Sequence, residues 1–285
     1  MIETATANVL VRKIDAGKIS SHEDFLACEE PLEIQLVFGS QENRIKKNIS
    51  VTMRTPGNDT ELAVGFLFTE GIISSPGELK SNPVAKENSM VVELQESVQP
   101  AIQKLERNFY TTSSCGVCGK SSIDAIKTVT ISANETDEIL VPVETIYSLP
   151  SLLRKTQDIF EQTGGLHASA LFDLSGNLLL MREDVGRHNA LDKLIGASFL
   201  TGSIPLKNRM LLLSGRASFE LIQKAVMAGI KLVAAVGAPS SLAVEMAQEF
   251  DVTLLGFLRD KRFNIYSGEK RIAVDKKLNF KNSFL

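Results

Sequence analysis

The stretch from Met210 to Leu255, MLLLSGRASFELIQKAVMAGIKLVAAVGAPSSLAVEMAQEFDVTLL, decides the fold class. Apolar runs at 210–213, 232–236 and 253–255 alternate with amphipathic segments at 219–227 and 242–250. Near-continuous apolar strands are typical of a sheet buried on both faces, and the helices between them make the crossovers that parallel strands need. We therefore expect an α/β unit with a parallel sheet covered by helices on both faces.

Two further elements should precede this unit. Residues 167–174 and 177–181 predict a hairpin around Ser175-Gly176, and residues 189–200 predict a helix. A longer helix is expected to begin at Ser148, with Pro150 in its first turn, and to run to Gly164.

The first third of the chain has a different pattern. Residues 8–14, 32–38 and 48–54 predict strands of one small sheet, and the apolar segment 61–68 predicts a helix packed on it. We place a domain boundary near residue 110. The expected organisation is a small β-rich α+β domain over 1–110 and an α/β domain over 111–285 that carries the cysteine motif described next.

Residues 111–120, TTSSCGVCGK, hold two of the three cysteines. Gly116 and Gly119 permit the tight turn that would bring Cys115 and Cys118 together, and Lys120 would favour their thiolate forms. A single CxxC fits a structural turn, half of a zinc site, a redox dithiol or a sulfur relay. Cys28 is expected to be a packing residue.

Polar residues follow each strand of the α/β unit, at 182–189, 214–218, 237–241 and 256–262. The carboxyl ends of parallel strands form a ligand crevice, where helix N-termini bind anions. Arginine binds phosphate there through two parallel hydrogen bonds. These loops predict a site for a phosphorylated, nucleotide-like ligand, unless their arginines are merely solvated. The arginines are Arg182, Arg187, Arg216, Arg259 and Arg262.

The histidines leave their roles open. His167, at the start of a strand, fits a core histidine better than a ligand, whereas His188 fits a proton carrier and a loop-holding residue equally well. Zinc is not expected, because the chain has no second CxxC, and Ser169 stands where a nucleobase deaminase has its glutamate. No strand is followed by the glycine pattern of a dehydrogenase.

Composition adds limits. The chain has 285 residues, 44% of them hydrophobic, and a net charge of -3, so bulk charge gives no drive towards nucleic acid or membrane. Its start lacks a signal-peptide pattern and no apolar run approaches a membrane span. Three cysteines are too few for a disulfide scaffold, so we expect a cytoplasmic protein.

Several stretches together resemble the FdhD family, the sulfur carriers required for formate dehydrogenase activity. The most specific are residues 115–120, CGVCGK, and residues 182–193, REDVGRHNALDK. Others are 30–34, 53–56, 62–67, 70–73, 163–167, 214–216 and 263–266, so the resemblance spans about residues 30–272.

The resemblance implies a sulfurtransferase that accepts persulfide sulfur from a cysteine desulfurase and passes it to the molybdenum cofactor of formate dehydrogenase, in its bis-guanine-dinucleotide form. Cys115 would carry the persulfide and Cys118 would be its partner. It also implies a cytidine-deaminase-like α/β/α sandwich and a homodimer, and a GDP-like nucleotide would fit the site. The expected cofactor-binding residues are Phe257, Leu258, Arg259, Asp260, Lys261, Arg262, Arg182, Arg187, His188, Ser214, Gly215 and Arg216.

Two other functions remain open from the residues alone. One is a non-enzymatic chaperone that binds the molybdenum cofactor and uses the CxxC as a structural clasp. The other is a zinc-dependent nucleotide hydrolase, which would contain stoichiometric zinc.

Overall fold

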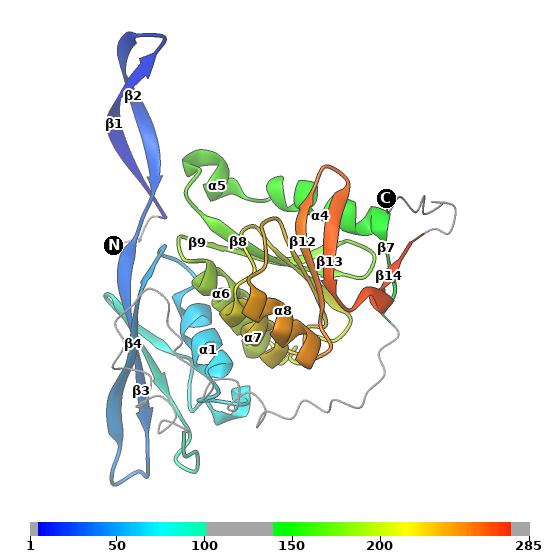
Figure 1. Ribbon diagram of the computed structural model, residues 1–285. Coiled ribbons are helices and arrows are strands. Elements are labelled where there is room, and N and C mark those ends of the chain that lie inside the picture. The colour runs from blue at the N-terminus through cyan, green and yellow to red at the C-terminus, as the bar shows by residue number, and fades with distance from the viewer. Residues whose placement is uncertain (1–4, 101–138, 275–285) are drawn as a thin grey trace.

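The computed structural model describes residues 5–100 and 139–274. The chain begins with a two-stranded antiparallel ribbon of β1 (Thr6–Asp15) and β2 (Lys18–Ala27), which projects from the rest of the molecule (Figure 1). We predicted that the first strand would join the sheet that follows it, and this is wrong. β1 pairs only with β2 among the described strands, because Gly17 reverses the chain directly into its own partner.

A four-stranded sheet follows, in the order β4-β3-β6-β5. Its strands are β3 (Glu30–Phe38), β4 (Ile45–Arg54), β5 (Val84–Lys86) and β6 (Ser89–Glu93), and a short 3₁₀ helix, Pro76–Glu78, precedes β5. Leu32, Ile34 and Leu36 alternate along β3 and turn one face of this sheet towards α1 (Asp59–Thr69). The predicted helix on the sheet is therefore confirmed.

Helix α1 also packs closely on α6 (Arg187–Leu200), through one glycine of each helix. A Cβ atom on Gly65 would lie 1.9 Å from the Asp192 carbonyl oxygen, and one on Gly196 would lie 1.8 Å from that of Glu61. The two backbones can approach this closely only because both positions lack a side chain. One continuous hydrophobic core therefore runs from the four-stranded sheet through α1 to α6 and the helices beyond it.

The larger sheet has six strands in the order β13-β12-β11-β10-β8-β9. β10 (Arg209–Leu213), β11 (Leu232–Ala235) and β12 (Thr253–Arg259) run parallel, as predicted. β8 (His167–Asp173) runs antiparallel to β10 and to β9 (Leu178–Asp184), and β13 (Arg262–Ser267) runs antiparallel to β12. The sheet is thus mixed, because a hairpin closes each of its ends.

Helices cover both faces of this sheet (Figure 1). α6, α7 (Phe219–Met227) and α8 (Ser241–Glu249) pack on one face and enclose the core shared with α1. α4 (Val143–Arg154) packs on the other face, beside the short strands β7 (Val141–Pro142) and β14 (Ile272–Ala273). A 3₁₀ helix, Glu269–Arg271, leads into β14. The α/β class is confirmed, whereas the likeness to cytidine deaminases stays a prediction.

The long helix predicted from Ser148 to Gly164 is wrong at its start and in its middle, whereas its end is confirmed, because Gly164 caps α5 (Asp158–Thr163) in a left-handed conformation. The structure has two helices instead, α4 and the short α5, which are separated by residues 155–157. Pro150 lies inside α4 rather than in its first turn, and the Ser148 hydroxyl donates to the carbonyl of Thr145 within the helix. Pro142 occupies the position just before the helix.

Two further predictions concern membrane-spanning segments and the domain boundary. Within residues 5–100 and 139–274, no helix is long and apolar enough to cross a membrane. The predicted domain boundary near residue 110 lies outside the described residues.

Candidate functional site

The loops after β10 and β11 and the end of β12 meet at the carboxyl ends of the parallel strands and are held together by backbone hydrogen bonds. The amide of Gly237, after β11, donates to the Gly215 carbonyl after β10 at 2.9 Å, and the amide of Phe257 donates to the Gly237 carbonyl at 3.1 Å. Because β8 runs antiparallel to β10, its first residue, His167, lies at this same edge. We call this edge the strand-end rim.

Ser214 fixes the position of His167 on the strand-end rim. The Ser214 hydroxyl accepts a hydrogen bond from the Ala168 amide at 2.8 Å, and the Ser214 amide donates to the Ala168 carbonyl at 3.0 Å. Gly215 lets the imidazole approach, since a Cβ atom there would lie 3.3 Å from His167 Nδ1. The Ser214 hydroxyl therefore supports the rim, and the loop backbone is left to face a ligand.

His188 belongs to the first turn of α6 and faces the start of α7. Its Nε2 atom lies 3.3 Å from the Ser218 hydroxyl and 3.8 Å from Glu220 Oε2. Neither partner is predicted from the sequence, although Ser218 stands at the N-cap position of a predicted helix, where such a residue is common.

Both rim histidines are neutral near pH 7. Burial lowers the pKa of His167, and the guanidinium groups of Arg187 and Arg216 lower it further against the opposing effect of Asp184. Burial, followed by Arg187 and Lys224, lowers the pKa of His188 to about 4. Neutral imidazoles donate or accept hydrogen bonds but add no positive charge, so the electrostatic attraction of an anion must come from the arginines.

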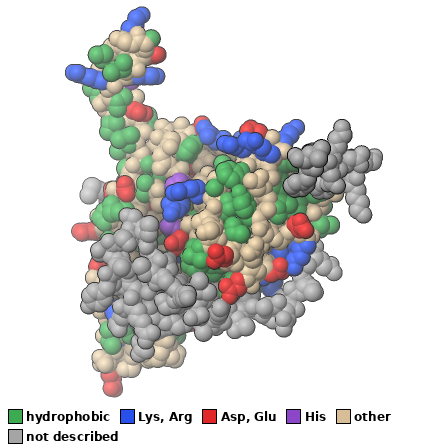
Figure 2. Space-filling model, viewed as in Figure 1, with side chains coloured by type: hydrophobic (Ala, Val, Ile, Leu, Met, Phe, Trp, Pro, Cys, Tyr) green, Lys and Arg blue, Asp and Glu red, His purple; other side chains and the backbone are tan. Residues whose placement is uncertain are grey.

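Arg187 is the residue of the strand-end rim that most clearly points to a ligand. Its Nε atom is buried and has no hydrogen-bond partner among the described residues. A buried donor without an acceptor is costly, and a phosphate oxygen would satisfy it with a charge-assisted bond. Figure 2 shows histidine side chains beside basic side chains in the middle of this face of the molecule. The residues present therefore fit the phosphate groups of a nucleotide.

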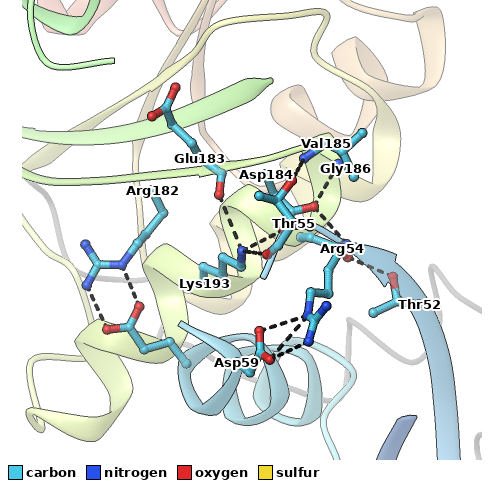
Figure 3. A network of polar contacts seen from close by, with 12 residues as sticks. Thr52, Arg54, Thr55, Asp59, Arg182, Glu183, Asp184, Val185, Gly186 and Lys193 are labelled. Atoms are coloured by element: carbon cyan, nitrogen blue, oxygen red, sulfur yellow. Dashed lines mark hydrogen bonds and ion pairs between the residues drawn. The ribbon is translucent and has the colours of Figure 1, made fainter. Parts of the chain in front are cut away.

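Arg182 is not part of this cluster. It lies on the edge strand β9 and forms a double hydrogen bond with Glu61 of α1, at 2.5 and 2.7 Å (Figure 3). It lines a separate cavity of about 490 Å³, together with Leu180 of β9, Lys207 and the first residue of β10, Arg209. Arg182 is therefore occupied by an ion pair away from the strand-end rim.

The predicted ligand segment 257–262 forms the end of a hairpin. Phe257 is 38% exposed and has a left-handed backbone with a φ of 56°, at an irregularity in the pairing of β12 with β13. Asp260 and Lys261 make the exposed turn between Arg259 and Arg262, whereas Leu258 is buried in the core on the α4 side. Phe257 is thus joined to the rim by its backbone, and Leu258 is a packing residue.

Much of the stretch 182–193 is buried in a polar network that joins β4 to α6 (Figure 3). Lys193 Nζ lies 2.7 Å from Asp184 Oδ2 and donates to the Thr55 carbonyl at 2.8 Å. Asp184 also accepts hydrogen bonds from the amides of Thr55 and Gly186. These side chains hold the four-stranded sheet against α6, whereas the ligand role predicted for Arg187 and His188 in the same stretch stays a prediction.

A second buried network involves Asp192, the residue of α6 that precedes Lys193. Lys224 of α7 donates to both carboxylate oxygens of Asp192 at 3.0 Å and to the Thr69 hydroxyl at 2.9 Å. Burial raises the pKa of Asp192, and the Asp192 and Glu70 carboxylates raise the pKa of Lys224 against its burial. The last turn of α1 is thereby joined to α6 and α7.

Cys115 and Cys118 lie outside the described residues. Cys28, between β2 and β3, is a half-buried free thiol. No cluster of three or more His, Cys, Asp or Glu side chains suited to a metal ion occurs in the described ranges 5–100 and 139–274. The expectation about zinc stays a prediction.

Comparison with known proteins gives the family. Residues 27–273 match the FdhD/NarQ family. The chain belongs to this family. The match includes the strand-end rim and both buried networks, and it begins at the last residue of the β1–β2 ribbon.

Curated relatives within the FdhD/NarQ family match nearly the whole chain. A protein from Streptomyces avermitilis named sulfur carrier protein FdhD is 49% identical over 275 residues, which cover 93% of this chain and 94% of the relative. Proteins of the same name from Mycobacterium tuberculosis and Sulfolobus acidocaldarius are 45% and 40% identical. These matches cover 94% and 93% of this chain, and 99% and 98% of the relatives.

A solved structure has the same fold as this FdhD/NarQ family member. It is the crystal structure of a protein from Desulfotalea psychrophila that is assigned as a formate dehydrogenase accessory protein. The TM-score is 0.73 at 22% identity, and the match covers 95% of this chain and all of that one.

Proposed function

We propose that the protein is a sulfur carrier for formate dehydrogenase. The observation that carries this proposal is the 40–49% identity to curated sulfur carrier proteins along more than nine-tenths of the chain. In detail, the protein would take persulfide sulfur from a cysteine desulfurase on Cys115. It would then pass this sulfur to the molybdenum cofactor in its bis-guanine-dinucleotide form. We expect it to act in the cytoplasm, as a homodimer.

Sulfur loading needs one nucleophilic exchange. The Cys115 thiolate attacks the outer sulfur of the donor persulfide, the sulfur–sulfur bond of the donor breaks, and the donor cysteine leaves as a thiolate. Cys115 then holds a persulfide, with no change in the total number of electrons. Lys120 would favour the thiolate that starts the reaction.

Release of the sulfur needs two electrons, which we assign to Cys118. Its thiolate attacks the inner sulfur of the Cys115 persulfide, a disulfide forms between the two cysteines, and the outer sulfur leaves as hydrosulfide. This hydrosulfide would be the form in which the molybdenum cofactor, the substrate of the transfer, receives its sulfur. A thiol reductant then returns both cysteines to thiols.

The strand-end rim is proposed to bind the nucleotide part of the cofactor. Arg187 supplies the buried unpartnered donor, and Arg216, on the loop after β10, supplies a second guanidinium. The glycine backbones of the two joined loops allow close approach of a pyrophosphate. His167 and His188, which are neutral, would contribute hydrogen bonds to the substrate rather than charge.

Mass spectrometry of the sulfur adduct tests the carrier function. After incubation with a cysteine desulfurase and L-cysteine, the wild type should gain one sulfur atom on Cys115. The matched control, Cys28→Ala, should gain the same adduct, and Cys115→Ala should gain none. An unchanged adduct on Cys115→Ala would refute the assignment. Full formate dehydrogenase activation by the double variant Cys115→Ala/Cys118→Ala would favour a cofactor-binding chaperone instead.

A further inference from the structure

The β1–β2 ribbon leaves most of its surface without contact to the rest of the described protein. It has ten paired positions, from Thr6 with Ala27 to Asp15 with Lys18, and projects away from the other elements (Figure 1). Its base is closed by a hydrogen bond from the Cys28 amide to the Ala5 carbonyl, and it contacts the body where α5 lies against β2. An isolated two-stranded ribbon is marginally stable in water, so we expect another surface to pack on this one.

One face of the ribbon is apolar and highly exposed. Leu10, Ile14, Ile19 and Phe25 are 76%, 71%, 68% and 44% exposed. Side chains of a strand alternate between its faces, and the strand register places all four on the same face. Exposed apolar side chains gathered on one face of a projecting ribbon, on both sides of the row that contains Arg12, indicate an interaction surface.

The same face carries two opposite charges in a self-complementary order. Counting rows of paired residues from the base, Phe25 lies opposite Asn8, Glu23 opposite Leu10, Arg12 opposite Ser21, and Ile14 opposite Ile19. A second ribbon that packs on this face in the opposite direction places its Ile14–Ile19 row over the row of Phe25. It also places its row of Arg12 over the row of Glu23. Apolar side chains then meet apolar ones, and each carboxylate meets a guanidinium.

This order of apolar and charged rows indicates that the partner that covers the ribbon is a second copy of the chain. A two-fold axis repeats each contact twice, which is the property of an interface between identical surfaces. Within residues 6–27, Arg12 and Glu23 are the charged residues of this face, because Lys13, Asp15, Lys18 and Asp24 lie on the other face. An antiparallel partner brings each Arg12 towards the Glu23 of the other copy. A uniformly charged partner would match only one of these two charges.

We propose, on the basis of the homodimer in the proposed function, that two copies of this chain assemble through their β1–β2 ribbons. The ribbons pack face to face and antiparallel about a two-fold axis. Phe25 covers the partner's Ile19, and Glu23 pairs with the partner's Arg12. Nearly all of the ribbon precedes residues 27–273, so the family match does not account for this surface.

Charge reversal tests the arrangement in the full chain. Sedimentation velocity should show a dimer for the wild type. Arg12→Glu and Glu23→Arg should each raise the dimer dissociation constant on the order of ten-fold or more, because two attractive pairs become repulsive. An equimolar mixture of the two variants should recover the dimer, since both cross-subunit pairs in the mixed dimer are again of opposite charge.

The mixture separates contacts between copies from contacts within one ribbon. Each single variant keeps two like charges on its own ribbon, and mixing cannot change that. The matched control is Lys13→Glu, which reverses a charge on the other face of the same ribbon and should leave the dimer intact. Equal melting temperatures would show that the variants retain their fold.

Several results would overturn the ribbon dimer. They are a wild type that stays monomeric, single variants that remain fully dimeric, and a mixture that fails to recover. A monomeric wild type that sediments with anionic lipid vesicles would assign the ribbon to a membrane surface instead. Sulfur loading of Cys115 by a monomeric single variant would leave the carrier function standing, so the two proposals fail independently.

Discussion

The buried ion pair between Lys193 and Asp184 gives the sharpest test of how the two sheets are held together. Lys193 Nζ lies 2.7 Å from Asp184 Oδ2, and the two side chains are 2% and 0% exposed. Asp184 also accepts hydrogen bonds from Thr55 N at 3.1 Å, Gly186 N at 2.8 Å and Asn189 Nδ2 at 3.1 Å. The carboxylate therefore has four donors, and the ammonium has one carboxylate and backbone carbonyls.

This asymmetry predicts unequal costs for removing either partner. Asp184→Asn leaves a buried ammonium without its counter-charge and should lower the free energy of unfolding by about 3–5 kcal/mol. Lys193→Met leaves the carboxylate with its three other donors and should cost about 1–3 kcal/mol. The double variant should cost less than the sum of the two, because the second change removes a charge that the first left unpaired.

Thermal melting of the purified chain measures these differences. At about 2–4 °C per kcal/mol for a domain of this size, Asp184→Asn should melt at least about 6 °C below the wild type. The matched control is Lys270→Ala, which breaks an ion pair whose side chains are 62% and 52% exposed and should cost at most about 1 kcal/mol. An Asp184→Asn protein that melts no lower than this control would refute the reasoning.

Three more outcomes are expected. In an NMR titration the His188 imidazole should titrate near pH 4. Because this folded pKa lies below the unfolded value of about 6.5, the contribution of His188 to stability should decrease as the pH falls from about 6.5 to about 4. A titration midpoint above pH 6 would contradict the argument that burial lowers the pKa. Gly196→Ala should separate α1 from α6 and lower the melting temperature by several degrees, whereas Gly77→Ala, with its nearest neighbour at 3.9 Å, should not. Calorimetric titration with GDP should show an affinity about ten-fold or more weaker for Arg216→Ala and unchanged for Arg182→Ala; equal losses would place Arg182 at the ligand.

The α/β part of the fold could be predicted because each of its elements has a strong periodic signal. The strands predicted at 210–213 and 232–236 and the helices predicted at 219–227 and 242–250 lie close to the observed bounds, whereas the strand predicted at 253–255 extends to Arg259. The helix at Ser148 failed because Pro150 resembles a first-turn proline, while the actual start follows Pro142. Local propensity cannot distinguish these two positions, since a proline inside a helix is tolerated when its surroundings fix it.

The candidate site could be predicted in part, for a similar reason. Loops after parallel strands converge by topology, so the convergence of the loops at 214–218 and 237–241 could be predicted, whereas the hydrogen bond from Gly237 to Gly215 depends on the strand order. The direction of Arg182 and the burial of Leu258 depend on which face of a strand each position occupies, and on the helix packed there. The stretch 182–193 supports the resemblance to the family. Several of its side chains hold β4 against α6, however, and only the tertiary structure reveals this contact.

A single-turnover transfer of labelled sulfur tests the central claim most directly. The chain is loaded with radioactive sulfur on Cys115, separated from the desulfurase, and mixed with molybdenum cofactor and formate dehydrogenase that lacks it. The account predicts that the label moves from the wild type to the cofactor in active formate dehydrogenase. It also predicts that the label stays on the carrier when Arg187 and Arg216 are replaced by alanine. Label that remains on the wild type while formate dehydrogenase becomes active would contradict the account.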